Sequence, residues 1–136
     1  MLICDTGPLY AVLNRKDQEH SRCLALLETH PGPLIVPGPV LTEVCWLLES
    51  RVGPEAEAQF LQSIVTGELI LEALTTEDVA RMIDLVRTYA DFPLGAADAS
   101  VIAVAERLNA HEIATLDRRH FHAVKPKHPS AFTLLP

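Results

Sequence analysis

The order of apolar segments in this chain predicts an α/β fold, a single three-layer domain with a central, mostly parallel sheet. Short apolar runs at residues 2–4, 34–36, 69–71 and 112–116 alternate with segments whose apolar residues recur at helical spacing. The run at 2–4 is apolar without interruption, as expected for a strand buried on both faces. A length of 136 residues, without a repeat or a linker, indicates one domain over 1–136.

The first quarter of the chain is expected to hold one strand and two helices before the second strand. Gly7-Pro8 allows a turn after the first strand, and a short helix can follow over 9–13. Asp17 is the expected N-cap of a helix whose inward stripe is His20, Cys23, Leu24 and Leu27. The prolines and glycine of residues 31–33 end that helix and lead into the strand at 34–36.

Two further helices are expected on either side of Gly53-Pro54. The first has apolar residues at helical spacing from Val40 to Leu48. Pro54 suits the first position of the second helix, and Gly67 suits its end. The side chains expected to face inward there are Phe60, Leu61, Ile64 and Val65.

The second half of the chain is expected to contain two helices and up to three strands. Thr75 and Asp78 resemble a capping box, with aspartate in place of the usual glutamate, and apolar residues recur from there to Tyr89. Residues 92–95 form a loop before a strong helix over 96–108. A fifth strand over 132–135 would lie at an edge of the sheet.

The composition excludes several classes of protein. A net charge of −7 argues against binding nucleic acid indiscriminately over the whole surface. No apolar run approaches the ~18 residues of a membrane span, and no secretion signal opens the sequence. The cysteines are three, an odd number, and each has apolar neighbours, which predicts buried thiols in a reducing cytoplasm.

Acidic residues stand where ligands of α/β proteins bind. Asp5 and Asp117 each close an apolar run, so parallel pairing would place both at the carboxyl edge of the sheet. Asp98 falls on the core-facing stripe of the helix over 96–108, where a lone charge is costly. Glu43 lies at the border of another apolar stripe. Each acid alone has an ordinary explanation in a helix dipole or a turn, but their convergence at one edge does not.

Four carboxylates in one place need neutralisation. Two such charges ~4 Å apart repel by roughly 4 kcal/mol at an effective dielectric near 20, against a total domain stability of about 5–15 kcal/mol. A divalent cation between them removes the repulsion, and a site built of oxygen ligands favours Mg²⁺ or Mn²⁺ over zinc. Such an ion can orient a phosphate and lower the pKa of a bound water.

A basic segment begins directly after Asp117. Residues 118–128 contain Arg118, Arg119, two lysines and three histidines, and no acid. A solvated basic loop would explain the segment as well as a phosphate-binding edge would, but its position beside a candidate ligand favours phosphate binding. A zinc site on His120, His122 and His128 is a weaker alternative, because no cysteine lies nearby.

The acids and their flanking residues resemble those of the PIN-domain family. The matching segments are residues 3–9 around Asp5, the helix start at Glu43, residues 94–100 around Asp98, and residues 114–121 around Asp117. More narrowly, the chain is similar to the VapC-type ribonuclease toxins of type II toxin–antitoxin systems. The likeness covers essentially the full length, and although each motif is weak singly, the ordered set is specific.

The resemblance implies a metal-dependent endoribonuclease that cleaves RNA with water. Asp5, Glu43, Asp98 and Asp117 take the family's acidic positions, with Asp5 and Asp98 as the expected direct ligands. Thr6 and Thr115 fall where the family often has a hydroxyl beside the acids, for water or phosphate, while Asp91 is a fifth acid whose role stays open. The family also implies a homodimer and a small antitoxin that blocks the site.

Four other interpretations of the sequence are possible. A receiver domain needs paired acids near the first strand, and a haloacid-dehalogenase-type phosphatase needs an aspartate two positions after the first; Thr6-Gly7 satisfies neither. A housekeeping PIN nuclease of RNA processing would share all four acids. A catalytically silent PIN module that binds RNA or protein would be expected to lack some of them.

Overall fold

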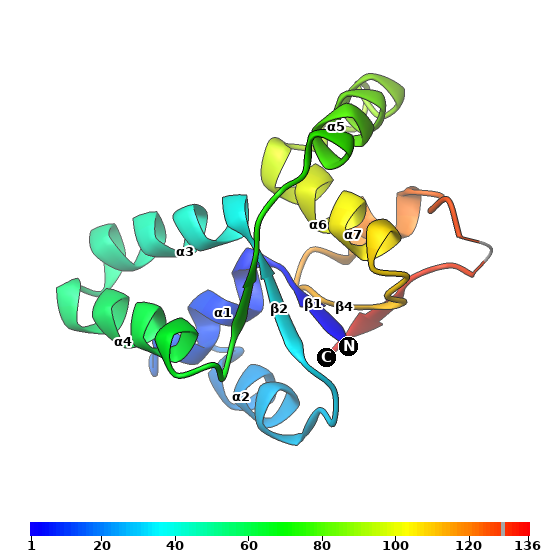
Figure 1. Ribbon diagram of the computed structural model, residues 1–136. Coiled ribbons are helices and arrows are strands. Elements are labelled where there is room, and N and C mark those ends of the chain that lie inside the picture. Colours follow the sequence, from blue (N-terminus) through cyan, green and yellow to red (C-terminus); the bar gives the residue numbers. More distant parts are fainter. Residues whose placement is uncertain (129) are drawn as a thin grey trace.

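The sheet is five-stranded and entirely parallel in the computed structural model, which describes residues 1–128 and 130–136 (Figure 1). The strands run in the order β3-β2-β1-β4-β5. Their bounds are β1 Leu2–Cys4, β2 Leu34–Pro37, β3 Ile70–Glu72, β4 Glu112–Ala114 and β5 Thr133–Leu135. The predicted parallel α/β fold is confirmed, and the predicted fifth strand lies at the edge beside β4.

Seven helices connect these strands in the described part of the chain. They are α1 Thr6–Leu13, α2 His20–Thr29, α3 Gly38–Arg51, α4 Pro54–Val65, α5 Thr76–Thr88, α6 Ala96–Arg107 and α7 Arg118–Ala123. Helices α1 to α4 pack together on one side of the sheet, and α6 and α7 lie on the other side with α5 outermost (Figure 1). None of the helices in the described residues has the length and apolar character needed to cross a bilayer.

The centre of the sheet is also the point where its connections reverse. Strand β1 pairs with β2 on one side and with β4 on the other, with Leu2 opposite both Leu34 and Glu112. From β1 the chain crosses to β2, whereas from β4 it crosses to β5 in the opposite direction. Open parallel sheets bind ligands at the carboxyl ends of strands at such a reversal. Asp5 follows β1 at this point, and Asp117 lies three residues after the end of β4.

Two predicted helix starts are wrong. Gly7-Pro8 does not form a turn ahead of a helix over 9–13; helix α1 begins at Thr6, because proline is tolerated in the first helical turn. Asp17 does not cap α2, which begins at His20 after Glu19. The Asp17 carboxylate instead accepts a hydrogen bond of 2.8 Å from the Glu19 backbone N–H within the preceding turn.

Three predictions of which side chains are buried are wrong in part. Leu61 and Val65 of α4 are exposed, at 41% and 79%, although Phe60 is buried as predicted. Helix α6 is buried well beyond the single core-facing stripe predicted for residues 96–108, with Ser100 and Ala103 also buried, because α5, α3 and β1 surround it. Of the cysteines, Cys4 and Cys23 are buried but Cys45 is only half-buried.

The capping box at the start of α5 forms with aspartate. The Asp78 backbone N–H donates to Thr75 Oγ1 at 3.1 Å, and the Thr75 backbone N–H donates to Asp78 Oδ2 at 3.0 Å. This reciprocal pair satisfies two backbone donors at the helix start. The box therefore fixes where α5 begins, as predicted.

Candidate active site

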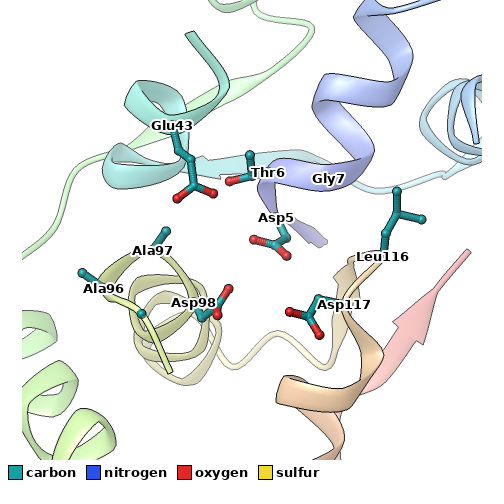
Figure 2. A pocket seen from close by; sticks show the side chains of 10 residues that line it. Asp5, Thr6, Gly7, Glu43, Ala96, Ala97, Asp98, Leu116 and Asp117 are labelled. Atoms are coloured by element: carbon teal, nitrogen blue, oxygen red, sulfur yellow. The ribbon is translucent and has the colours of Figure 1, made fainter. Parts of the chain in front are cut away.

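An acidic cleft opens at the carboxyl end of the sheet, with a volume of about 470 Å³. Four different elements supply its carboxylates: Asp5 follows β1, Glu43 lies on α3, Asp98 on α6, and Asp117 just before α7. Figure 2 shows the four carboxylates directed into one shared space. The structure thus brings together all four acids that the sequence singled out.

Short residues form the remaining wall. Gly95, Ala96 and Ala97 line the cleft at the start of α6, and Gly7 lines it at the start of α1 (Figure 2). A Cβ atom added to Gly7 would lie 3.3 Å from the Leu116 side chain, a tight contact. Small residues at these positions leave room for a ligand between the carboxylates.

Asp5 is the most buried of the four acids, at 5% exposure. Its Oδ2 atom accepts a hydrogen bond of 2.8 Å from the hydroxyl of Thr115, which is fully buried. Burial raises the pKa of the Asp5 carboxyl to about 6; repulsion by Asp98 and Glu43 adds to the rise, and the Thr115 hydrogen bond opposes it. An ionised Asp5 is therefore unfavourable unless a positive charge accompanies it.

The pKa of the Asp98 carboxyl is raised as well. Burial raises the pKa of its carboxyl, His120 opposes the rise, and repulsion by Asp117 and Glu43 strengthens it. In the described residues, no lysine or arginine forms an ion pair with any of the four cleft acids. The cleft consequently concentrates negative charge that the protein itself leaves largely uncompensated.

Hydroxyl groups stand beside the acids as the sequence predicted. The Thr115 hydroxyl donates to Asp5 and accepts a hydrogen bond of 3.0 Å from the Asp117 backbone N–H. Thr6 lines the cleft, and of the buried side-chain polar atoms that the structure describes, its Oγ1 alone lacks a hydrogen-bond partner. A buried polar atom without a partner is costly, so Thr6 Oγ1 is suited to a water or a ligand oxygen in the cleft.

His120 lies at the acidic cleft, although the sequence pattern places it in an alternative zinc site with His122 and His128. Its Nδ1 atom lies 2.5 Å from Asp117 Oδ2 and 3.5 Å from Asp98 Oδ2. Asp98, Asp117 and His120 form the single group of three metal-ligand side chains found among the described residues. The sequence carries a signal for this contact, because His120 follows Asp117 by three positions and a helix places residues at that spacing on one face.

The three histidines of the basic segment do not gather around a zinc site. His128 Nε2 lies 3.1 Å from the carbonyl oxygen of Ala110, and its ring packs against His111 and Phe132. His122 is exposed on α7. The zinc alternative on His120, His122 and His128 is therefore wrong.

The two arginines after Asp117 lie outside the lining of the cleft. The Arg118 guanidinium donates to the carbonyl oxygen of Pro136, and Arg119 lies against the ring of Phe92. Both side chains are exposed. Asp91 is also exposed and does not line the cleft, so the geometry assigns it no role.

The fold and the cleft together define a class: a parallel α/β domain with a candidate metal site, built of acids, at its topological switch point. Residues 2–126 match the PIN domain. The chain is 30% identical over 135 residues to ribonuclease VapC26 of Mycobacterium tuberculosis, which covers 99% of this chain and 100% of that protein. The chain belongs to the PIN-domain family and is a homologue of the VapC ribonucleases.

Solved structures share the fold. Mycobacterium tuberculosis VapC20, a sarcin-ricin loop cleaving toxin, superposes with a TM-score of 0.84 at 20% identity, over 93% of this chain and 100% of that chain. VapBC from Salmonella typhimurium, solved bound to DNA, gives a TM-score of 0.67 at 14% identity, over 98% and 95% of the two chains. FitAcB from Neisseria gonorrhoeae gives 0.68 at 17% identity, over 90% and 92%.

Proposed function

We propose that this protein is an endoribonuclease dependent on Mg²⁺ or Mn²⁺ and acts as the toxin of a type II toxin–antitoxin pair. The observation that carries the proposal is the convergence of four carboxylates, without lysine or arginine partners in the described residues, on one cleft. The homology to ribonuclease VapC26 supports RNA as the substrate. The three free cysteines suit a cytoplasmic protein, where thiols stay reduced.

The donor set fits a hard divalent cation. Asp5 and Asp98 are the proposed direct ligands, with Glu43 and Asp117 completing the set. Their oxygens are the ligand type that Mg²⁺ and Mn²⁺ prefer, and the raised pKa values of the Asp5 and Asp98 carboxyls would fall again beside a positive charge. When bound, the ion would orient a phosphate, lower the pKa of a water molecule and stabilise the leaving oxygen.

The surrounding residues hold these acids in place. The Thr115 hydroxyl fixes the Oδ2 atom of Asp5, and the same hydroxyl anchors the backbone at Asp117. His120 fixes the Asp117 carboxylate through its Nδ1 atom. Thr6 is proposed to hydrogen-bond a water or a phosphate oxygen, since its hydroxyl lacks a protein partner among the described residues.

The basic residues after Asp117 are proposed to contact the RNA backbone. Arg118 and Arg119 are exposed on α7, the helix that carries His120. Positive charge beside an acidic cleft would hold the phosphates that flank the cleaved bond. The two arginines would thereby counter the repulsion between RNA and a protein of net charge −7.

The proposed protein partners are a second copy of the chain and a small antitoxin. The DNA-bound VapBC complex with a similar fold supports an antitoxin partner. The test is co-expression with the product of the neighbouring gene, followed by co-purification and inhibition of RNA cleavage. Light scattering on the purified chain tests the homodimer: twice the monomer mass is expected, and a monomer at all concentrations would reject it.

The activity is tested with purified, antitoxin-free protein on RNA. Cleavage is expected with Mg²⁺ or Mn²⁺ and not in chelator. Asp5→Asn or Asp98→Asn should lower kcat/KM at least about a hundredfold, because loss of a metal ligand costs more than loss of a residue that orients the ligand. Glu43→Gln has a matched control on the same helix, Glu49→Gln, which removes an exposed acid outside the cleft. Full activity of Asp5→Asn or Asp98→Asn, or unchanged activity in chelator, would reject the proposal.

A further inference from the structure

An arginine is held against an aromatic ring at the edge of the cleft. Phe92 lies in the loop between α5 and α6, and Arg119 lies in the first turn of α7. The Arg119 Cζ atom stands 5.2 Å from the centroid of the Phe92 ring. The same ring also makes a T-shaped contact with His120, with centroids 5.0 Å apart and an interplanar angle of 80°.

The Arg119 guanidinium is available to a ligand. In the described part of the chain, Arg22, Arg81 and Arg107 form ion pairs, but Arg119 forms neither an ion pair nor a hydrogen bond. An aromatic face uses none of the five N–H donors of a guanidinium, whereas a carboxylate would occupy two. Its donors and its outer face are therefore free, on an exposed side chain.

The loop beneath the pair is anchored before any ligand binds. The Phe92 backbone N–H donates to the carbonyl oxygen of Tyr89 at 3.0 Å. The backbone N–H of Lys125, which follows α7, donates to the Tyr89 hydroxyl at 3.0 Å. Tyr89 thus ties the loop of Phe92 to the segment after α7, which reduces the ordering cost of binding there.

His120 connects this pair to the acids. Its ring contacts Phe92, and its Nδ1 atom lies within 3.5 Å of carboxylate oxygens of both Asp98 and Asp117. The aromatic–guanidinium pair consequently lies one side chain away from the candidate metal ligands. A group bound on the pair would be a close neighbour of a phosphate bound in the cleft.

We propose that Phe92 and Arg119 form a nucleobase-stacking subsite for single-stranded RNA, which positions the nucleotide next to the cleaved phosphate. The inference rests on the proposed ribonuclease function and adds where the substrate is held. A planar guanidinium backed by an aromatic ring presents a flat face to a base, while its free N–H groups reach a phosphate. Stacking tolerates any base, so this subsite would position RNA more than select its sequence.

The test measures cleavage and binding of a fluorescent single-stranded RNA oligonucleotide by the full chain. With Mg²⁺, Phe92→Ala and Arg119→Gln are expected to raise KM about tenfold, the effect of one lost stacking contact, with a smaller change in kcat. In chelator, where the RNA stays intact, fluorescence anisotropy should show a similar rise in Kd. Arg119→Lys separates charge from stacking: it keeps the charge but loses the planar group, so KM and Kd should still rise several-fold above those of the parent, whereas Phe92→Trp should resemble the parent.

Arg15→Gln is the matched control, because it removes the same charge from an exposed position beyond the far end of α1. A parent protein that fails to cleave RNA with Mg²⁺ would reject the proposed function, whatever the variants do. A parent that cleaves, with KM and Kd unchanged in Phe92→Ala and Arg119→Gln, would reject the stacking subsite alone. Arg119→Lys behaving like the parent would reject stacking in favour of simple charge. Melting temperatures confirm that the variants are folded.

Discussion

Two groups of acidic side chains in this molecule deal with their charge in opposite ways. Glu72, Asp78 and Glu106 lie beside Arg81 and Arg107. The Arg107 Nε atom is 3.0 Å from both oxygens of Asp78, and Arg81 makes two hydrogen bonds to Glu106, of 2.7 and 3.1 Å. We call these five residues the paired cluster.

The cleft acids, Asp5, Glu43, Asp98 and Asp117, have no such partners among the described residues. His120 contacts two of them, Asp98 and Asp117. The pKa values follow this difference. Burial pushes the pKa of Asp78 upward, but hydrogen bonds from Arg107 and Thr75 outweigh it and leave the pKa below its usual value. Burial raises the pKa of Asp5 and Asp98, and neighbouring acids raise it further.

The contrast separates acids that have arginine partners from acids that we propose to bind a cation. The paired cluster joins α5 and α6 through ion pairs, and each of its acids has an arginine partner. Under the proposed function, the buried charges of Asp5 and Asp98 lower the stability of the metal-free protein and become favourable when a divalent ion lies beside them. Removing a charge should therefore lower the free energy of unfolding in the paired cluster and raise it in the cleft of the metal-free protein.

The largest effect is expected in the paired cluster. Arg107→Met leaves the buried Asp78 carboxylate without its partner and should lower the free energy of unfolding by about 3 kcal/mol. The control is Arg22→Met, which breaks an exposed pair with Glu19 and should cost less than about 1 kcal/mol. Both values come from urea unfolding. Equal effects of the two substitutions would show that the cluster does not act as a buried ion pair.

The cleft should make the metal-free protein less stable as pH rises. The Asp5 carboxyl has a pKa of about 6 in the folded state and an ordinary value of 3.8. Between these values the folded state binds more protons than the unfolded state, so the free energy of unfolding decreases as pH rises from about 4 to about 6. The difference between these two pKa values corresponds to about 3 kcal/mol at most in the free energy of unfolding. This contribution is lost by pH 7.

Urea unfolding in chelator from pH 4 to pH 7 measures this dependence. Asp5→Asn cannot titrate, so the decrease with pH should be smaller in this variant than in the parent. Asp78, whose pKa is lowered, contributes in the opposite direction in both proteins and cancels in the comparison. Identical pH profiles would mean that Asp5 does not titrate in this range.

Removing the charge of Asp98 should also stabilise the metal-free protein, by less than the removal of the Asp5 charge. In chelator at pH 7, Asp98→Asn removes a partly buried charge repelled by Asp117 and Glu43, so it should raise the free energy of unfolding by up to about 1 kcal/mol. Thermal melting of the parent and the variant is sufficient to detect the sign. A clear drop in melting temperature would identify Asp98 as a structural hydrogen-bonding acid.

Much of this arrangement could be predicted from sequence because it follows from local patterns. The apolar run before Asp5 predicts a buried central strand, and parallel pairing then brings Asp5 and Asp117 to one edge. Thr75 and Asp78 predict their own capping box from a spacing of three residues. The signal for the buried strand and for the capping box lies within a few residues, and the general rule for parallel sheets supplies the long-range step.

The errors arise where tertiary packing decides. A helical wheel assigns one buried face, but α6 is covered from several sides, so Ser100 and Ala103 are buried as well. Val65 fits the apolar stripe of α4 but lies beyond the reach of the core, near the end of the helix. The sequence pattern places His120 with His122 and His128 in an alternative zinc site. The first turn of α7 instead directs the His120 side chain to Asp117 and Asp98.

Metal binding measured by itself tests the central claim most directly, because it requires no knowledge of the RNA. Calorimetric titration with Mn²⁺, together with melting curves at the same concentrations, should show binding to the parent. At a metal concentration of about 100 times Kd, the gain in stability is about 2.7 kcal/mol. The double variant Asp5→Asn, Asp98→Asn should bind at least about a hundredfold more weakly and show no comparable stabilisation. Absence of Mn²⁺ binding by the parent, or equal binding by the double variant, would contradict the assignment of the cleft as a cation site.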